Sequence, residues 1–250
     1  MKTTLFFLTV HSLSAATAAL GALNTAKVSE IVRSVEILRP PTYQASAKLG
    51  DIVSGQTTVR TGIKSRTQLT FPDQTLLRLG SNTQFSFQDG DSEFTLTRGT
   101  AVLKTTKASG GARIRTGAGT AAITGSMAAF TGPEAGNAGV VKLLLYYGTA
   151  ALEVGGKTFN LKPWQMAVVP VDANGVARPE DVRIFWFDAA LNAQTSKLVD
   201  PDEDVLAEHL AQFRANLSGS FLASVTTSTD FAGVPSSAIQ DANVPGNLPP

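Results

Sequence analysis

The sequence lacks the residue types on which several classes of protein depend. It contains no cysteine, which excludes disulfide bonds, thiolate zinc sites, cysteine nucleophiles and a lipid-anchored N-terminal cysteine. Charged residues make up only 16%, and 21 basic side chains nearly balance 20 acidic ones, so no strong field attracts nucleic acid or an anionic membrane. The hydrophobic fraction of 43% in 250 residues is nevertheless enough for a genuine core.

The first 22 residues have the pattern of an export signal. Lys2 supplies a positive charge, residues 5–10 (LFFLTV) form a short apolar stretch, and residues 16–18 (ATA) form a small-x-small cleavage pattern. A second cleavage pattern at residues 20–22, an uncleaved anchor and an ordinary amphipathic segment stay open as alternatives. Because no later stretch approaches transmembrane length, we expect residues 1–22 to be a signal peptide and the mature protein to be soluble outside the cytoplasm.

Two sequence fragments recur in the same order. VRTG at residues 59–62 returns as IRTG at 114–117, and GTAVL at 99–103 returns as GTAAL at 148–152. A period of roughly fifty residues is typical of stacked supersecondary units that share a core. Two copies are too few to establish an array, so we interpret them as a pseudo-duplication inside one domain.

The middle of the chain has the hydrophobic period of β-strands. Apolar and polar residues alternate between residues 69 and 103, with a turn predicted at Pro72–Gln74 (PDQ). Residues 140–147 (VVKLLLYY) are apolar in both alternating sets, which predicts a strand that is covered on both faces. Gly155-Gly156 and Asn174-Gly175 predict two hairpins.

The segments before and after this block of strands have other sequence patterns. Residues 28–38 are rich in β-branched residues and precede Pro40-Pro41, which predicts an edge strand or a strand pair. Past residue 178 we predict a helical region over 179–219, with Asp200 as N-cap and Pro201 at the first helical position. The apolar residues of this helix follow helical spacing: Leu206, Leu210, Phe213 and Leu217. The tail at 220–250, rich in serine, threonine and proline, is expected to be disordered.

Several segments of the β block, taken in order, are similar to a known family. They share a rhythm of glycine steps between strands: 59–65 (VRTGIKS), 69–79 (LTFPDQTLLRL), 96–101 (LTRGTA), 114–116 (IRT), 123–126 (ITGS) and 161–165 (LKPWQ). From about residue 49 to residue 169 the chain resembles the FecR family domain. The resemblance implies an exported, sensory β-domain, which we place at residues 28–178.

The chain also departs from that family pattern. The second turn has Asp73-Gln74 where the family usually has aspartate-glycine, and GSMA at 125–128 replaces glycine-threonine-x-phenylalanine, with Phe130 displaced. Founding members carry a cytoplasmic anti-sigma segment and a transmembrane helix before this domain, and sense an outer-membrane siderophore receptor. Since neither segment is recognisable in this sequence, we expect the β-domain without the signalling output.

Four residues are candidate binding residues. Arg60 and Arg115 occupy equivalent places in the two copies and suit an anionic partner, although a charge on the outward face of a strand is the more common reason for such residues. Tyr43 and Trp186 offer stacking surfaces to a sugar ring or a partner, and Trp186 alternatively docks the C-terminal segment onto the sheet. Trp164 alternates with apolar residues, so we expect it to point inward.

The remaining reactive side chains do not form a catalytic pattern. His209 is the one histidine beyond the signal, which excludes a histidine triad or a multi-histidine metal site, and it reads as a helix-surface residue. Asp89, Asp91 and Glu93 lack the spacing of a calcium loop and fit a solvated hairpin tip. GAGT at residues 117–120 is half of a dinucleotide fingerprint and is interpreted as a turn. We therefore expect no catalytic residue, cofactor or metal.

Together these observations predict an all-β protein, a stacked-sheet roll or solenoid-like β domain with a pseudo-duplicated core and a small helical C-terminal region. The predicted function is a non-enzymatic, exported binding or interaction module of the cell envelope, periplasmic or extracellular. Its expected partner is an envelope protein or glycan, not nucleic acid. The alternatives are a self-associating structural envelope component, a siderophore-sensing signalling protein and, last, a carbohydrate-active enzyme.

Overall fold

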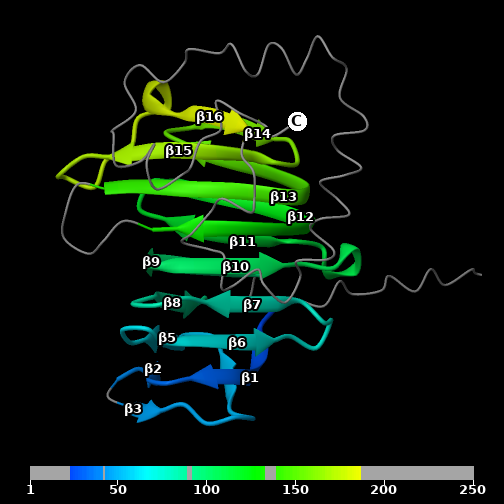
Figure 1. Ribbon diagram of the computed structural model, residues 1–250, viewed down its shortest axis with the longest axis vertical. Helices are drawn as coiled ribbons and strands as arrows, with labels where there is room; N and C mark the ends of the chain where they lie inside the picture. Colours follow the sequence, from blue (N-terminus) through cyan, green and yellow to red (C-terminus); the bar gives the residue numbers. More distant parts are fainter. Residues whose placement is uncertain (1–22, 42, 89–91, 133–138, 187–250) are drawn as a thin grey trace, which may run out of the picture.

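The computed structural model describes residues 23–41, 43–88, 92–132 and 139–186, and within them the protein is all-β (Figure 1). Apart from strands, these residues contain two 3-10 turns, η1 (Lys107–Ser109) and η2 (Pro179–Asp181). The strands are β1 (Thr25–Val32), β2 (Val35–Arg39), β3 (Tyr43–Ser46), β4 (Ile52–Ser54), β5 (Thr58–Thr61), β6 (Arg66–Thr70), β7 (Leu76–Leu79), β8 (Gln84–Phe87), β9 (Glu93–Arg98), β10 (Thr100–Lys104), β11 (Ala112–Thr116), β12 (Gly119–Thr131), β13 (Gly139–Val154), β14 (Lys157–Leu161), β15 (Gln165–Val171) and β16 (Arg183–Trp186). The all-β expectation is confirmed.

Several predicted segments fall outside the described residues. These are the signal peptide, the Asp89–Asp91 turn, the helix from Pro201 and the tail. Within the described part of the chain, no helix is long and apolar enough to cross a bilayer. The prediction of a helical region from residue 179 is wrong for residues 183–186. These residues form β16, which extends the sheet by pairing with β15.

All 16 strands belong to one strongly curled sheet. One run of neighbours, β3-β2-β5-β8-β9-β11, forms what we call the first arm, and β10-β7-β6-β1-β4 forms the second arm. Figure 1 shows the strands stacked in successive levels from β3 to β16, with one strand of each arm at most of the lower levels. Buried residues of both arms belong to a single hydrophobic cluster, so the two arms face each other across one core.

Two long strands explain why there is one sheet rather than two stacked sheets. β12 pairs with β11 through its first half and with β10 through its second half, so it belongs to both arms. β13 continues both arms in the same way, pairing with β14 at one end and β15 at the other. Register shifts at Thr124/Met127 and Met127/Ala128 mark where the strands bend from one arm to the other.

The core is built from every second residue of the strands, as the alternation of apolar and polar residues predicts. Phe85 and Phe87 point inward from β8, and Phe94 points inward from β9, while the residues between them face outward. These three rings and Phe71 form one aromatic cluster, in which contacting rings have centroid distances of 5.4–6.0 Å. Such aromatic clusters bury large apolar areas and therefore dominate the core energetics.

Threonine hydroxyls form hydrogen bonds with backbone groups where the chain passes from one arm to the other. Thr61 Oγ1 donates to the Gly80 carbonyl and accepts from the Thr83 N–H, and Thr83 Oγ1 bridges the N–H and carbonyl of Thr100. Gly99, at φ +86°, lies against Thr83 so closely that a Cβ would stand 2.4 Å from the Thr83 Cα. The threonine-glycine rhythm of the sequence thus satisfies buried backbone groups at these crossings.

The local predictions about turns and burial are largely confirmed. β13 is buried on both faces from Val141 to Tyr146, and Gly155-Gly156 forms the β13–β14 hairpin with both φ angles positive. The Asp172 N–H and carbonyl close the predicted turn at Asn174-Gly175. The prediction of an edge strand or a strand pair at 28–38 is wrong: the segment forms β1 and β2, which do not pair with each other, lie in opposite arms and are both internal to the sheet.

The recurring fragments do not form two superimposable copies. Residues 59–62 and 114–117 both end strands of the first arm, as a duplication requires. Residues 99–103, however, form β10 of the second arm, whereas 148–152 lie in the half of β13 that continues the first arm. Similar glycine-led strands are thus used at different places in the sheet.

Candidate functional site

The outward surface of the first arm is a continuous polar face. Because Val59, Phe85 and Ile114 point into the core, their neighbours along each strand point to solvent. Seven of these outward residues lie in register across β5, β8, β9, β11, β12, β13 and β14: Thr58, Ser86, Thr95, Arg115, Thr120, Glu153 and Thr158. Six steps of about 4.8 Å give this row a length of about 29 Å. We call this surface the polar face.

Ion pairs and hydroxyl contacts hold the polar face together. Arg60 Nη2 lies 2.6 Å from Glu36 Oε2, and Arg115 Nη2 lies 2.6 Å from Glu93 Oε1. Thr58 Oγ1 and Ser86 Oγ are 2.7 Å apart. Pairing across neighbouring strands balances the charge, so the face offers hydrogen-bonding groups rather than a strong field.

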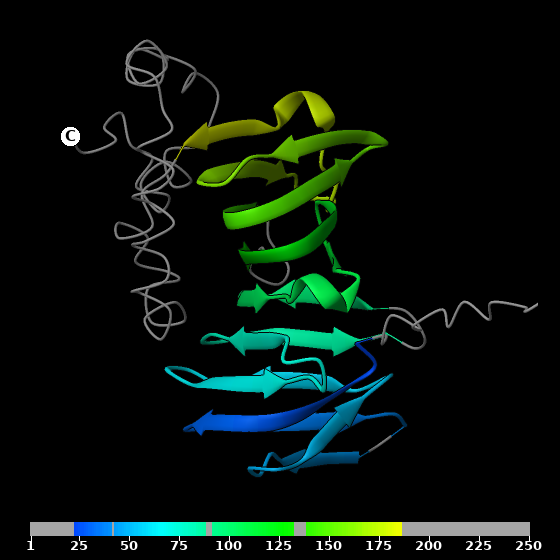
Figure 2. The ribbon, with the colours of Figure 1, turned by 90° about the vertical axis from the view of Figure 1, so that its right-hand side faces the viewer.

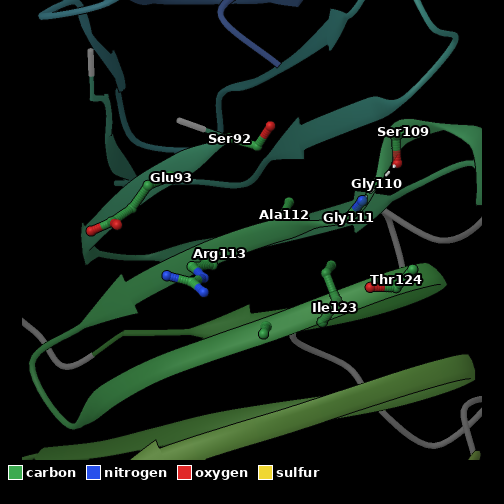
Figure 3. Close-up of a pocket in the computed structure, with 10 residues that line it drawn as sticks. Ser92, Glu93, Ser109, Gly110, Gly111, Ala112, Arg113, Ile123 and Thr124 are labelled. Carbon is green, nitrogen blue, oxygen red and sulfur yellow. Dashed lines mark hydrogen bonds between the residues drawn. The ribbon is translucent and has the colours of Figure 1, made fainter. Parts of the chain in front are cut away.

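A hollow of about 560 Å³ opens between β9, β11 and β12 (Figure 3). Glu93 and Arg113 are in register on the parallel pair β9 and β11, and Figure 3 shows their side chains beside each other. The other wall is the turn at Ser109–Gly111, where Ser109 Oγ accepts from the Gly111 N–H and donates to the Thr106 carbonyl. Thr124 on β12 completes the far side. The hollow therefore presents one acid, one cation, hydroxyls and backbone groups.

The hollow contains few ionisable groups among its described lining. Glu93, the one carboxylate among the described residues that line the hollow, is engaged by Arg115. No group of three or more His, Cys, Asp or Glu residues that could hold a metal occurs within the described ranges. A glycosidase needs two carboxyl groups flanking the bond, and the hollow does not supply that pair.

The structure does not bring the four sequence-predicted binding residues together. Arg60 and Arg115 both lie on the polar face, three strands or about 14 Å apart, and both pair with glutamates. Tyr43 is 54% exposed on β3, under the Arg39 guanidinium at 5.2 Å. Trp186 ends β16, at the opposite end of the stack (Figure 1).

Sequence reasoning missed Arg113 and assigned Glu93 to a solvated hairpin tip, whereas Glu93 begins β9. Both positions are polar residues in alternating strands, which is the one signal that marks them as outward. What makes them neighbours is the parallel β9–β11 pairing, which skips β10 along the chain. No local pattern reveals such a crossover.

Opposite the polar face, the outward surface of the upper second arm is apolar. Val102, Ala129, Leu144, Met166 and Phe185 lie in register across β10, β12, β13, β15 and β16, and all are buried although they point away from the core cluster. We call this surface the apolar face.

Trp164 belongs to the apolar face. It is buried, as predicted, but packs edge-on against the outward Tyr146 with ring centroids 6.0 Å apart. Its burial is therefore on the apolar face, not in the cluster between the two arms. Trp164 lies in a turn with φ +64°, and the outward Met166 two residues later sets the phase of the strand.

Comparisons with known proteins agree with the resemblance seen in the sequence. Residues 57–157 match the model of the family described as FecR protein. Two crystal structures of a candidate anti-sigma factor from Parabacteroides distasonis ATCC 8503 are similar, at 14% identity and TM-scores of 0.44 and 0.43. Each similarity covers 53% of this chain and 60% of that one. No curated protein matches the sequence. The chain therefore contains a FecR domain, which begins just before β5 and ends at the first residue of β14.

Proposed function

We propose that this protein is a non-enzymatic binding module of the cell envelope, exported by its N-terminal signal, and that it binds a partner through the polar face. The observation that carries the proposal is the extent of the FecR domain. Its residues 57–157 supply every strand of the seven-residue polar row except most of β14. The matched residues and the polar row thus coincide over nearly their whole extent.

The geometry of the polar face fits recognition of a protein surface. Side chains on a sheet stand at fixed spacings, so the row from Thr58 to Thr158 offers an ordered array of hydroxyls and charges. The hollow at Glu93 and Arg113 adds a concave point where a partner side chain can enter. Balanced charge favours specificity through hydrogen bonds over long-range attraction.

Capture from envelope extracts tests the proposal. The full chain is immobilised beside a variant with Arg113→Glu, which places two acids at the hollow without touching the core. The matched control is Lys27→Glu, an exposed cation on β1 of the second arm. We expect the unaltered chain and Lys27→Glu to retain the same specific protein partner. The amount of this partner that is recovered should fall at least tenfold with Arg113→Glu.

Failure of the capture has a clear meaning. Recovery of no partner under several extraction conditions, or equal recovery with both variants, contradicts binding at the polar face. Recovery of a glycan instead of a protein changes the partner class. If genes for a sigma factor and an outer-membrane receptor lie beside this one, the siderophore-sensing alternative gains support.

A second candidate function is self-association as a structural component of the envelope. The observation that favours it is the number of open edges: within the described residues, β3, β4, β14 and β16 each pair with a single strand. Open edges accept a further strand from another chain. Sedimentation velocity over a hundredfold concentration range checks it, and a constant monomer excludes it.

A further inference from the structure

The residues of the apolar face are buried, yet no described strand forms a layer over them. Leu144, Met166 and Tyr146 are each 0% exposed, although they point away from the core between the arms. All described strands belong to the one sheet, and none of them forms a third layer over this surface (Figures 1 and 2). An uncovered surface of this size and composition would be a liability in a monomer.

We propose that residues 201–217 of the same chain form an amphipathic helix that packs across the apolar face and makes it the second core of the protein. The sequence of this segment supports a helix independently. Asp200 and Pro201 are a cap and a first-turn residue, and the apolar positions fall on one side: Leu206, Leu210, Phe213 and Leu217.

The dimensions match. Seventeen residues at 1.5 Å each make a helix of about 26 Å. From β7 to β16 the surface is crossed by five interstrand steps of about 4.8 Å, or about 24 Å. The described chain stops at Trp186 on β16, which is the edge of this surface, and residues 187–200 can span at most about 46 Å. The segment can therefore start at one side of the surface and cross it.

The charges match as well. Two cations lie on the same outward surface and are nearly buried: Arg78 is 6% exposed and Lys142 is 2% exposed. In the proposed helix, Asp202 and Glu203 flank the apolar stripe in the first turn, whereas Asp204 and Glu208 lie on the opposite side. A segment with acids beside an apolar stripe suits such a surface, since buried cations require anionic or hydrogen-bonding neighbours.

Cysteine labelling tests the proposal in the full chain, because the natural sequence has no cysteine to interfere. Ala129→Cys places a thiol on the apolar face, Ala122→Cys places one on the exposed polar face, and Ala128→Cys places one in the core between the arms. We expect Ala129→Cys to react with a soluble maleimide at least tenfold more slowly than Ala122→Cys.

Substitutions in the proposed helix then distinguish its detachment from the apolar face from unfolding of the whole protein. Adding Leu210→Asp with Phe213→Asp should accelerate labelling of Ala129→Cys at least tenfold, while Ala128→Cys stays protected. Gln212→Asp, on the opposite side of the same helix, is the matched control and should change nothing. The proposal is overturned if Ala129→Cys is labelled fast when the helix sequence is unaltered. It is also overturned if Leu210→Asp with Phe213→Asp does not accelerate this labelling.

An engineered disulfide identifies the occupant. The pair Ala129→Cys with Leu210→Cys should oxidise to an intrachain bond at all protein concentrations, whereas Ala122→Cys with Leu210→Cys should not. A covalent dimer as the main product would mean that a second copy covers the surface, and would refute the assignment to the same chain. None of these measurements depends on whether the polar face binds a partner.

Discussion

The two outward surfaces of this sheet differ completely although the strands beneath them share one inward pattern. On the polar face, Thr95 is flanked by Ser86 and Arg115 and is partly exposed. On the apolar face, Leu144 is flanked by Ala129 and Met166 and is fully buried. The inward residues of a sheet therefore reveal that it has a core, and the outward residues reveal what each side of it meets.

The sharpest way to break this comparison is to shorten one outward side chain on each surface. Leu144→Ala should lower the free energy of unfolding by about 2–5 kcal/mol, because it leaves a cavity in a covered surface. Thr95→Ala should change it by no more than about 0.5 kcal/mol, because the polar face is solvated. Urea unfolding monitored by tryptophan fluorescence measures both. Equal effects would show that the two surfaces are not differently covered.

A second substitution examines the crossing between the arms. Gly99→Ala should destabilise the protein by about 2–4 kcal/mol, since it combines an unfavourable φ of +86° with a clash against Thr83. Gly156→Ala is the matched control, because its φ is +79° but no atom lies within 4 Å of the added Cβ. Its cost should be about 1 kcal/mol. Thermal unfolding of both variants gives the difference, and indistinguishable midpoints would contradict the close packing at Gly99.

A third substitution concerns the bend through which β12 leaves the first arm. Ser126 Oγ accepts from the Thr149 N–H and donates to the Thr124 carbonyl, and both hydrogen bonds are partly buried. Ser126→Ala should cost about 1–3 kcal/mol, because the Thr149 N–H loses its acceptor. Thr158→Ala on exposed β14 is the control and should be nearly neutral. Hydrogen exchange at Thr149 should accelerate in the first variant only.

The smallest expected effect lies on the polar face itself. A double-mutant cycle with Arg60→Gln and Glu36→Gln should give a coupling energy of about 0.2–1 kcal/mol, because both side chains are about one-third exposed. The coupling should shrink further in 1 M salt. A value above about 2 kcal/mol would mean that this pair is far less solvated than the structure indicates.

Local sequence patterns predicted much of the fold. The turns at Gln74, Gly155 and Gly175 were predictable, since proline and aspartate at the first and glycine at the other two act on the backbone within a few residues. The double burial of β13 was predictable too, because apolar residues occupy both alternating sets. The neighbours in the hollow were harder to predict, since Arg113 and Glu93 come together only through a pairing that skips a strand.

The amino-acid sequence alone determined the strand content, the turns, the inward faces and the family resemblance, because each depends on residues close together in the chain. Only the tertiary structure decided that the sheet is single, that Trp164 packs outside the main core, and that the repeated fragments lie on different arms. Those features depend on which distant strands exchange hydrogen bonds. Backbone groups are the same in every residue, so their pairing is selected by the packing of the whole molecule rather than by any one segment.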